Sequence, residues 1–403
     1  MSTGSGTGSD WADWVEAACG QVEAAGRWRA PTVFDARGHD GLLHSAAGPA
    51  RAVVSFASND YLGLASHPDV VAAAREALDR WGAGAGASRL VTGSRPVHHE
   101  LEEALAQWKG TESAMVFPTG FAANLSVLSV FGGGGVVVHS DELNHASIID
   151  GCRLARADVR IVPHRDLDAL DASLSSVEGR SLVVSDTVFS MDGDAVDLEG
   201  LCAVAARHGA LLVLDEAHAV LGPDLEVNHR ADVLRVGTQS KTLGSLGGFV
   251  AGPSRFIELL VNRARPYIFT TAPSPADAAA ALAAVGIVRS AEGDELRRRL
   301  EHHVGRVARA TGLPGHASPI HPVIIGAEAD AVAASASLLE RGLWVPAIRP
   351  PTVAPGTSRL RITLSATHTD AQVDRLVDGL AEVVPAGAPD TRPVVGRGVG
   401  SAA

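Results

Sequence analysis

The sequence predicts an α/β fold with two parts, a large domain built on a mostly parallel, seven-stranded sheet and a smaller α+β domain at the C-terminal end. Two observations predict it. Seven short apolar runs, each about as long as a buried strand, occur in the middle of the chain, and helical stretches lie between several of them. This alternation stops near Ala276, where a different order of helices and strands follows. With 403 residues, 46% of them hydrophobic, the chain is long enough to bury both cores.

Helical spacing of apolar residues predicts three helices ahead of the sheet. The first runs from Trp11 to about Arg27, and the other two cover Asp69–Trp81 and His99–Trp108, separated by a glycine-rich segment. The seven expected strands are Ala114–Phe117, Val136–His139, Val159–Val162, Leu182–Ser185, Leu211–Leu214, Val233–Val236 and Phe249–Ala251.

The C-terminal part begins with an Ala-rich and then Arg-rich segment, for which we expect one long helix over Ala276–Thr311. The elements expected after it are Pro322–Gly326, a helix near Ala331–Arg341, the segment Leu343–Ile348, a strand over Arg359–Leu364 and a helix over Asp370–Val383. The chain therefore divides into a flexible tail (1–10), an N-terminal helix and arm (11–57), a large domain (58–275), a small domain (276–384) and a disordered tail (385–403).

Composition argues against several classes of function. The formal net charge of -12 disfavours binding to nucleic acid, because an acidic chain repels phosphate backbones. No apolar run approaches the roughly 20 residues that span a bilayer, so no membrane segment is expected. Cys19, Cys152 and Cys202 lack metal-ligand spacing, and so small and odd a number indicates a reducing cytoplasm.

Lys241 is the first candidate for chemistry. Among 34 Lys and Arg residues only Lys109 and Lys241 are lysines, and only lysine can act as an amine nucleophile. A phosphate-binding P-loop is excluded, because Ser240 stands where that motif requires glycine. Two interpretations remain open: a solvated loop lysine, or a lysine that binds a carbonyl cofactor in a partly desolvated cleft.

Other polar residues follow the predicted strands, at the edge where open α/β sheets bind ligands. Asp215 ends the run Leu211–Leu214, where it could cap the next turn or pair with a cationic ring nitrogen. His145 follows another strand. Gly120 and Phe121 open a helix, whose first backbone N–H groups could bind phosphate.

Taken together, these segments resemble the α-oxoamine synthases, within the fold type I pyridoxal-phosphate (PLP) transferases. The resemblance extends from about Arg27 to Ala381 and rests on the joint order of modest motifs. These are Ser58–Gly63, Gly82–Gly93, Thr119–Asn124, Asn144–Ser147, Val188–Asp194, Asp215–His218 and Thr238–Lys241. The segment Trp344–Arg361 is most similar to the biotin-pathway member, which condenses L-alanine with a pimeloyl thioester of coenzyme A or an acyl-carrier protein.

The resemblance implies a role for each site residue and a homodimer. The cofactor roles fall on Lys241 (covalent attachment, then transfer of the α-proton), Asp215 (ring nitrogen), His145 (ring face), Ser190 and His218 (phenolic oxygen), and Gly120, Phe121 and Thr238 (phosphate or ring edge). The substrate roles fall on Arg361 (the amino-acid carboxylate, which arginine can bind in bidentate fashion), His145, Asn59 and Thr352 (the amino-acid and acyl pocket) and Arg27 (an acyl contact, or a helix cap).

Two segments depart from the family pattern. Ala219–Pro223 replaces the usual Gly-containing turn after His218. Ala272 stands where a hydroxyl residue is common, so one phosphate contact is either missing or supplied by Thr270 or Thr271. Three alternative functions are a sibling synthase that uses glycine with another acyl-CoA, a nucleic-acid motor suggested by the helicase-like Asp215–His218, and a catalytically inactive binding protein of the same fold. The missing Walker loop argues against the motor, and retention of Lys241 argues against the inactive protein.

Overall fold

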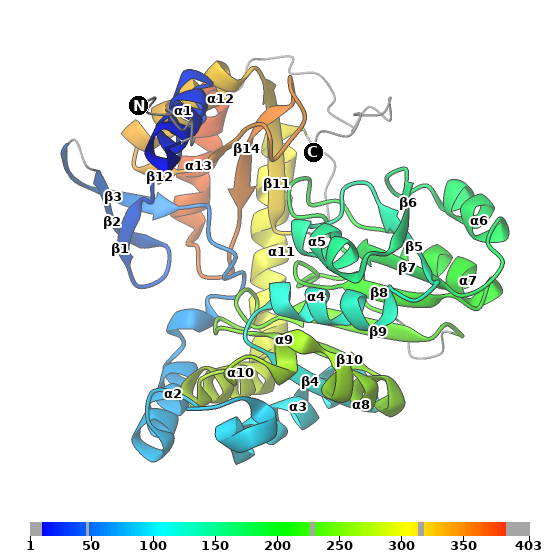
Figure 1. Ribbon diagram of the computed structural model, residues 1–403. Helices are drawn as coiled ribbons and strands as arrows, with labels where there is room; N and C mark the ends of the chain where they lie inside the picture. Colours follow the sequence, from blue (N-terminus) through cyan, green and yellow to red (C-terminus); the bar gives the residue numbers. More distant parts are fainter. Residues whose placement is uncertain (1–9, 46–47, 226–229, 313–317, 384–403) are drawn as a thin grey trace, which may run out of the picture.

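A seven-stranded sheet forms the centre of the computed structural model, which describes residues 10–45, 48–225, 230–312 and 318–383 (Figure 1). The tails predicted at 1–10 and 385–403 lie outside these ranges, apart from Asp10. In spatial order the strands are β4 (Ser113–Phe117), β10 (Gly248–Gly252), β9 (Val233–Thr238), β8 (Leu211–Asp215), β7 (Ser181–Asp186), β5 (Val137–Asp141) and β6 (Asp158–Val162). Only β10 runs antiparallel to its neighbours, so the predicted mostly parallel sheet is confirmed.

Helices cover both faces of this sheet, which explains why its strands are apolar on both sides. Alternate residues of one strand show it: Leu182 and Val184 of β7 pack in one core cluster, and Val183 packs in another. The first face is covered by α4 (Gly120–Phe131), α5 (Ala146–Ala155), α8 (Ser254–Arg263) and α9 (Arg265–Ile268). The second is covered by α6 (Leu167–Ser175), α7 (Leu198–Arg207), α2 (Pro68–Trp81), α3 (Pro96–Lys109) and α10 (Pro275–Val288).

The smaller part contains two further sheets. One is antiparallel, with order β11 (Ile320–Gly326), β14 (Ser358–Thr363), β13 (Ala347–Ile348). The other joins β1 (Val33–Ala36), β2 (Asp40–Ser45) and β3 (Gly48–Ser55) from the N-terminal region to β12 (Leu343–Trp344). The remaining elements are α1 (Trp11–Ala24), α11 (Ala291–Thr311), α12 (Glu328–Glu340), α13 (Asp370–Val383), and the short turns η1 (Leu64–Ser66) and η2 (Arg89–Gly93).

The long helix expected over Ala276–Thr311 is two helices, α10 and α11. Ser290 adopts an extended conformation and precedes a first turn that contains Glu292 and Asp294, which is a helix-start pattern. Gly293 then passes close under the end of α10, where a Cβ would lie 2.5 Å from the carbonyl oxygen of Ile287. The break lets α10 pack on the outer helices of the large sheet while α11 runs up to the smaller part (Figure 1).

The carboxyl ends of the parallel strands meet at one edge of the large sheet, where ligands of such folds bind. Strand β14 of the smaller part reaches this edge, because Arg361 Nε donates to the carbonyl oxygen of Ser190 at 2.6 Å. The site therefore lies between the two parts. Within the described residues, no helix is both long and apolar enough to cross a bilayer.

Candidate active site

Lys241 lies three residues beyond β9, at the end of a chain of buried polar groups. Its Nζ is 2.7 Å from Nε2 of His218, and Nδ1 of His218 is 2.5 Å from the hydroxyl of Tyr61. Burial lowers the pKa of Lys241, against the opposing effect of Asp215 and Asp186, whose negative charges favour the ammonium form. A lowered pKa makes the free amine, which is the nucleophilic and basic form, more accessible.

His218, the partner of Lys241, and Tyr61, the partner of His218, are both uncharged. His218 is only 4% exposed, and burial, followed by the positive charges of Lys241 and Arg361, holds its pKa well below the usual value. Tyr61 is fully buried, which raises its pKa and keeps its phenol protonated. His218 can therefore hydrogen-bond to the Lys241 amine, and Tyr61 to His218, without placing a second charge beside that amine.

Asp215 is the last residue of β8 and divides its carboxylate between two contacts. Its Oδ1 accepts the backbone N–H of Ala217 at 2.9 Å, and its Oδ2 accepts Nδ2 of Asn124 at 2.6 Å. Asn124, on α4, also donates to the hydroxyl of Ser147 at 2.9 Å. The side chain of Asp215 is thus buried and fixed in orientation, as required of an anion that faces a cationic ring nitrogen.

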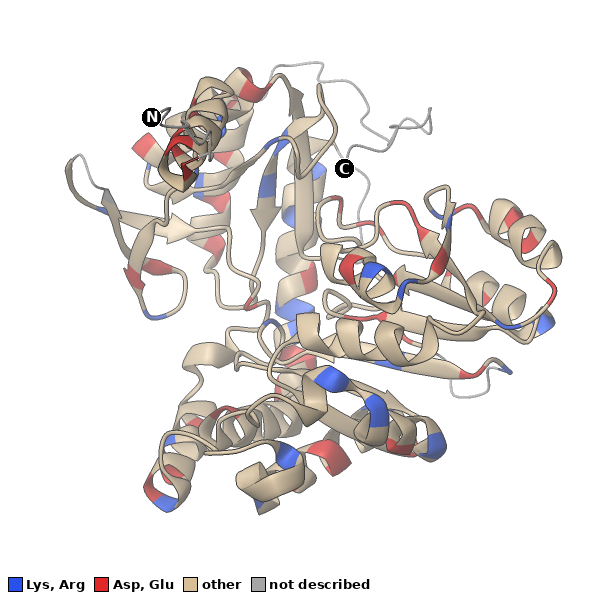
Figure 2. Cartoon of the chain, viewed as in Figure 1, with Lys and Arg blue, Asp and Glu red and all other residues tan. Residues whose placement is uncertain are grey.

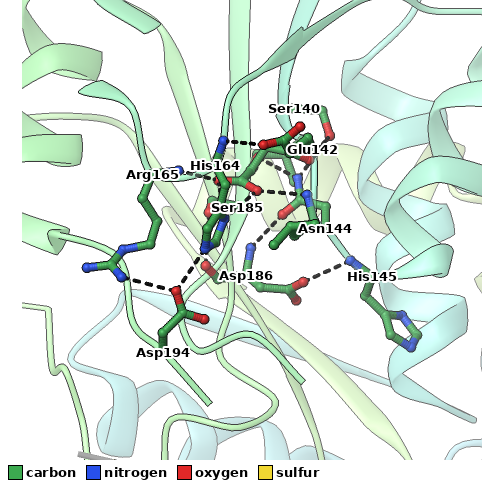
Figure 3. A network of polar contacts seen from close by, with 12 residues as sticks. Ser140, Glu142, Asn144, His145, His164, Arg165, Ser185, Asp186 and Asp194 are labelled. Carbon is green, nitrogen blue, oxygen red and sulfur yellow. Dashed lines mark hydrogen bonds and ion pairs between the residues drawn. The ribbon is translucent and has the colours of Figure 1, made fainter. Parts of the chain in front are cut away.

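His145 lies between β5 and α5, where it caps the helix. Its Nδ1 accepts the backbone N–H of Ser147 at 3.2 Å, which leaves the proton of the neutral ring on Nε2. Burial lowers the pKa of His145; the charge of Asp215 opposes this shift and that of Lys241 adds to it. The backbone N–H of His145 donates to Oδ2 of Asp186, at the end of β7, at 2.8 Å (Figure 3). Burial, reinforced by the nearby charge of Asp215, holds the pKa of Asp186 well above its usual value.

Arg361 on β14 supplies the positive charge of the site. Its side chain is buried, and its guanidinium donates to Ser190 O at 2.6 Å, to Thr363 Oγ1 at 2.9 Å and to Asn59 Oδ1 at 3.3 Å. The same Asn59 oxygen accepts the hydroxyl of Tyr61 at 3.2 Å. Arg361 is therefore joined to Lys241 through Asn59, Tyr61 and His218, so a buried guanidinium and a buried amine share one network.

The start of α4 forms a cradle against the end of β9. Thr119 caps the helix by accepting the N–H of Ala122 at 3.0 Å, and a Cβ on Gly120 would lie 3.2 Å from Cβ of Thr238. The first N–H groups of a helix have no carbonyl partner within it and bind phosphate well. Because the Phe121 side chain is 42% exposed, its backbone rather than its ring is the expected contact.

Comparison with known proteins agrees with this geometry. Residues 51–380 match the family Aminotransferase class I and II. The 8-amino-7-oxononanoate synthase of Paraburkholderia xenovorans is 47% identical over 351 residues, which cover 83% of this chain and 89% of the relative. The synthase of the same name from Anaeromyxobacter dehalogenans is 49% identical over 354 residues, which cover 83% and 87%.

The chain belongs to the 8-amino-7-oxononanoate synthase family. A solved structure of serine palmitoyltransferase from S. paucimobilis with a bound PLP–myriocin aldimine has a TM-score of 0.83 and 31% identity, and covers 92% of this chain and 96% of its own. The predicted fold type I PLP transferase and its cofactor are thereby confirmed. The family match argues against the helicase-like interpretation of Asp215–His218, and contact of this segment with the cofactor stays a prediction.

The residues present fit PLP. An amine (Lys241), a fixed carboxylate (Asp215), a helix start (Gly120) and a flat neutral ring (His145) match an aldehyde, a pyridine nitrogen, a phosphate and a ring face. A further sign is the side-chain oxygen of Asn124, which is buried without a hydrogen-bond partner among the described residues. These four residues lie on separate strand ends or loops at one edge of the sheet, and their contacts with PLP stay predictions.

The two residues predicted on the acyl side, Arg27 and Thr352, lie around a second arginine, Arg349. Arg27 forms an ion pair with Glu328 at 3.4 Å. The Arg349 guanidinium donates to the backbone oxygen of Gly26 at 3.1 Å. The Arg349 carbonyl accepts the N–H of Thr352 at 3.1 Å. None of these contacts joins the network of Lys241. Their roles in this family stay predictions.

The structure describes both segments that depart from the family pattern, the turn after His218 and the surroundings of Ala272. After His218 the chain turns back on itself, with the N–H of Val220 donating to the His218 carbonyl at 3.0 Å, and residues 226–229 beyond it lie outside the described ranges. Ala272 is buried, and its N–H donates to the carbonyl of Ala87 at 3.0 Å. A phosphate contact at this position would have to come from Thr270 or Thr271.

Sequence reasoning assigned no role to three residues of the site, Tyr61, Asn124 and Asp186. A signal was present for Asp186, because it follows the predicted strand Leu182–Ser185 just as Asp215 follows its own strand. Asn124 lies one helical turn after Gly120 and so points to the same side of α4. For Tyr61 there was no local signal, since its partner His218 is 157 residues away in the sequence.

Proposed function

We propose that the protein catalyses the decarboxylative condensation of L-alanine with a pimeloyl thioester, which gives 8-amino-7-oxononanoate, carbon dioxide and a free thiol in biotin biosynthesis. The relatives that share 47–49% of their residues with this chain bear the corresponding name. The observation that carries the proposal is the network from Arg361 through Asn59 and Tyr61 to His218 and Lys241. It combines a carboxylate receptor with an amine base, as an α-amino acid substrate requires.

The residues of the chain divide the work of the reaction. When bound, PLP withdraws electrons from Cα of the amino acid, which supports both loss of the α-proton and loss of carbon dioxide. Arg361 binds the alanine carboxylate and orients Cα, and Lys241 takes the proton from Cα as a free amine. Asp215 stabilises positive charge on the ring nitrogen, and His218, held by Tyr61, orients the Lys241 amine between proton transfers.

On the acyl side, the far end of a pimeloyl chain is a carboxylate, which must be met by a cation or a polar group. Arg27 is the candidate. Among the described residues its ion-pair partner is Glu328, at 3.4 Å and itself partly exposed, and its Nε is buried without a hydrogen-bond partner there. The donor thiol is that of coenzyme A or of an acyl-carrier protein.

The proposed working form is a cytoplasmic homodimer with the active site near the subunit boundary. Large apolar side chains are exposed on elements that adjoin the site, among them Val91, Phe121, Leu246 and Phe269. Clusters of such side chains favour a protein partner. All three cysteines lie in the described residues and are free, which supports a reducing compartment.

Steady-state kinetics with four substrate pairings test the function: alanine or glycine against pimeloyl or acetyl thioester. We expect the highest kcat/KM for alanine with the pimeloyl donor. A pocket that accepts one extra methyl group separates alanine from glycine by only about 1–3 kcal/mol, so this preference is the smaller one. If glycine with the short acyl donor gives the highest kcat/KM, the alternative, a sibling synthase that uses glycine, replaces the proposal.

A matched pair of variants tests the acyl contact in the same assay. Arg27→Ala should raise the KM for the pimeloyl thioester and leave the KM for alanine unchanged. Arg29→Ala, an exposed arginine two residues further on, serves as the control for charge alone. Equal pimeloyl KM values for the two variants would remove Arg27 from the acyl pocket.

A further inference from the structure

His164 ties together two loops at the ligand-binding edge of the large sheet. It follows β6, and its buried ring lies between two carboxylates: Nδ1 is 3.0 Å from Oδ1 of Asp141, and Nε2 is 2.8 Å from Oδ2 of Asp194 (Figure 3). Asp141 is the last residue of β5, and Asp194 lies in the loop after β7. One side chain thus joins segments that extend from three strands.

The geometry favours the cationic form of His164. A neutral imidazole donates through only one nitrogen, whereas here each nitrogen faces a carboxylate oxygen. Burial alone would lower the pKa of His164, but its hydrogen bonds to Asp141 and Asp194 and their charges raise it to about 9. Arg165 adds a second cation, with its guanidinium 3.0 Å from Asp194 Oδ2, so two positive and two negative charges balance.

From Asp141 the contacts lead to His145. Asp141 accepts the N–H of Leu143 at 2.9 Å, and the neighbouring Glu142 accepts the backbone N–H of His164 at 2.9 Å. Asn144 accepts the N–H of Asp186 at 2.9 Å, and Asp186 in turn accepts the N–H of His145. Every residue from 141 to 145 is therefore held by at least one polar contact, and Figure 3 shows this for Glu142, Asn144 and His145.

From Asp194 the contacts lead to Arg361. The loop closes on itself, because the carbonyl of Asp194 accepts the N–H of Phe189 at 2.9 Å. The His164 ring packs edge-on against Phe189, with 4.4 Å between ring centroids. At the tip of the loop the carbonyl of Ser190 accepts Arg361 Nε, and Asp192 forms an ion pair with Arg359 on the same strand, β14.

We infer that His164 is a positioning residue, which as a cation between Asp141 and Asp194 sets the distance between the loop that carries His145 and the loop that holds Arg361. It would act through these residues, without touching substrate or cofactor. The inference rests on the proposed function, in which Arg361 binds the alanine carboxylate. A displaced Arg361 guanidinium would weaken amino-acid binding and misalign Cα with the Lys241 amine.

The test compares His164→Gln with wild-type holoenzyme by titrating the absorbance of bound PLP with L-alanine. We expect the Kd for alanine to rise roughly 10-fold and kcat to fall about 10- to 100-fold, because small misplacements of a substrate are costly in turnover. The control is His208→Gln. His208 also pairs with an aspartate, Asp171, which in turn pairs with Arg207, but these residues belong to α6 and to the end of α7, away from the polar network of Lys241. This control should bind alanine as the wild type does.

The pH dependence separates positioning by a cation from a merely structural role. A raised pKa means that the contribution of His164 is complete below its ordinary value of 6.5 and is lost as the pH rises through about 9. The ratio of the two alanine Kd values should therefore be constant near pH 6 and approach one near pH 10. The difference in Tm between wild type and His164→Gln, measured without added substrate, should shrink over the same range.

Each outcome has one meaning. A wild-type Kd in His164→Gln, or a Kd ratio that does not change with pH, overturns the inference. If His164→Gln does not fold, Asp194→Asn takes its place, since it keeps the side-chain volume and removes one of the two charges that hold the ring. If wild-type enzyme responds to glycine and not to alanine, the proposed function fails, and the same comparison made with glycine still decides the role of His164.

Discussion

Asp215 uses its two carboxylate oxygens for different contacts. From the sequence alone, capping of the next turn and pairing with a ring nitrogen were both open. The structure shows that Oδ1 makes the capping contact, with the N–H of Ala217, while Oδ2 is turned toward Asn124 on α4. The two interpretations are therefore compatible, and the contact with the ring nitrogen stays a prediction.

Asp215→Asn should keep the fold and lose most of the activity. The amide fills the same space and can still cap the turn, but it brings no negative charge to stabilise the ring, so kcat should fall roughly 100-fold or more. Turnover and the absorbance spectrum of bound PLP are the measurements.

A matched control for Asp215→Asn is Asp197→Asn. Asp197 caps α7 by accepting the N–H of Gly200 at 3.0 Å, outside the polar network of Lys241, and asparagine caps a helix as well as aspartate does. Wild-type turnover in Asp215→Asn would show that the charge of Asp215 has no part in the chemistry.

Local sequence patterns were enough to find the site residues that follow strands. They were not enough to find the residues that hydrogen-bond to those site residues. Lys241, Asp215 and His145 each stand at a strand end, which is visible in the sequence. Tyr61 comes from the distant segment before η1, and its contact with His218 exists only because the fold brings the two together. A single sequence does not encode that proximity in any local pattern.

The end of β8 illustrates how one strand serves both site and core. Asp215 enters the polar network, whereas the next residue, Glu216, is buried against Lys109 at 2.8 Å and Arg235 at 2.6 Å. Nζ of Lys109 also lies 3.9 Å from the ring centroid of Trp108. The second lysine of the chain is therefore structural, so the rarity of lysine could not by itself single out Lys241.

Glu216→Ala should destabilise the protein by about 3–5 kcal/mol, because it leaves two buried cations without their partner. Burial would raise the pKa of Glu216, but Lys109 and Arg235 lower it below its usual value. The stabilisation is thus complete above the ordinary pKa of 4.5 and is lost as the pH falls below it. The free energy of unfolding in denaturant is the measurement.

Glu295→Ala gives the reference for Glu216→Ala, since Glu295 pairs with Arg298 on the exposed face of α11 and should contribute little. If the two variants were equally stable, the buried triad would have no net stabilising effect.

Among the elements, apolar runs located every strand of the large sheet but not the N-terminal strands. Only the last three residues of β3 are buried, so its sequence lacks the apolar pattern of a core strand. The break between α10 and α11 does carry a local signal, since Ser290 followed by Glu292 and Asp294 is a helix-start pattern. The close approach of Gly293 to Ile287, which fixes the turn, is visible only in the packed structure.

Charge over the chain as a whole agrees with a small-molecule enzyme. Basic and acidic residues are interspersed through both parts of the structure, without a basic stripe along the described elements (Figure 2). The net charge of -12 disfavours electrostatic attraction to nucleic acid.

Sedimentation should give twice the chain mass of 41.5 kDa at assay concentrations. The exposed apolar side chains beside the site motivate this expectation, and Phe269, 69% exposed, is the most informative to change. Phe269→Glu should shift the equilibrium toward monomer and reduce activity together. A fully active monomer would contradict the proposed homodimer.

The lysine that binds the cofactor can be identified directly by chemical labelling, because Lys109 and Lys241 are the only lysines in the sequence. Borohydride reduction of the holoenzyme fixes PLP to the amine that holds it, and mass spectrometry of the digested protein then locates the added mass. The network around Lys241 predicts the added mass on the peptide that contains Lys241, with the Lys109 peptide unmodified. Added mass on the Lys109 peptide, or on neither, would contradict the assignment of this site.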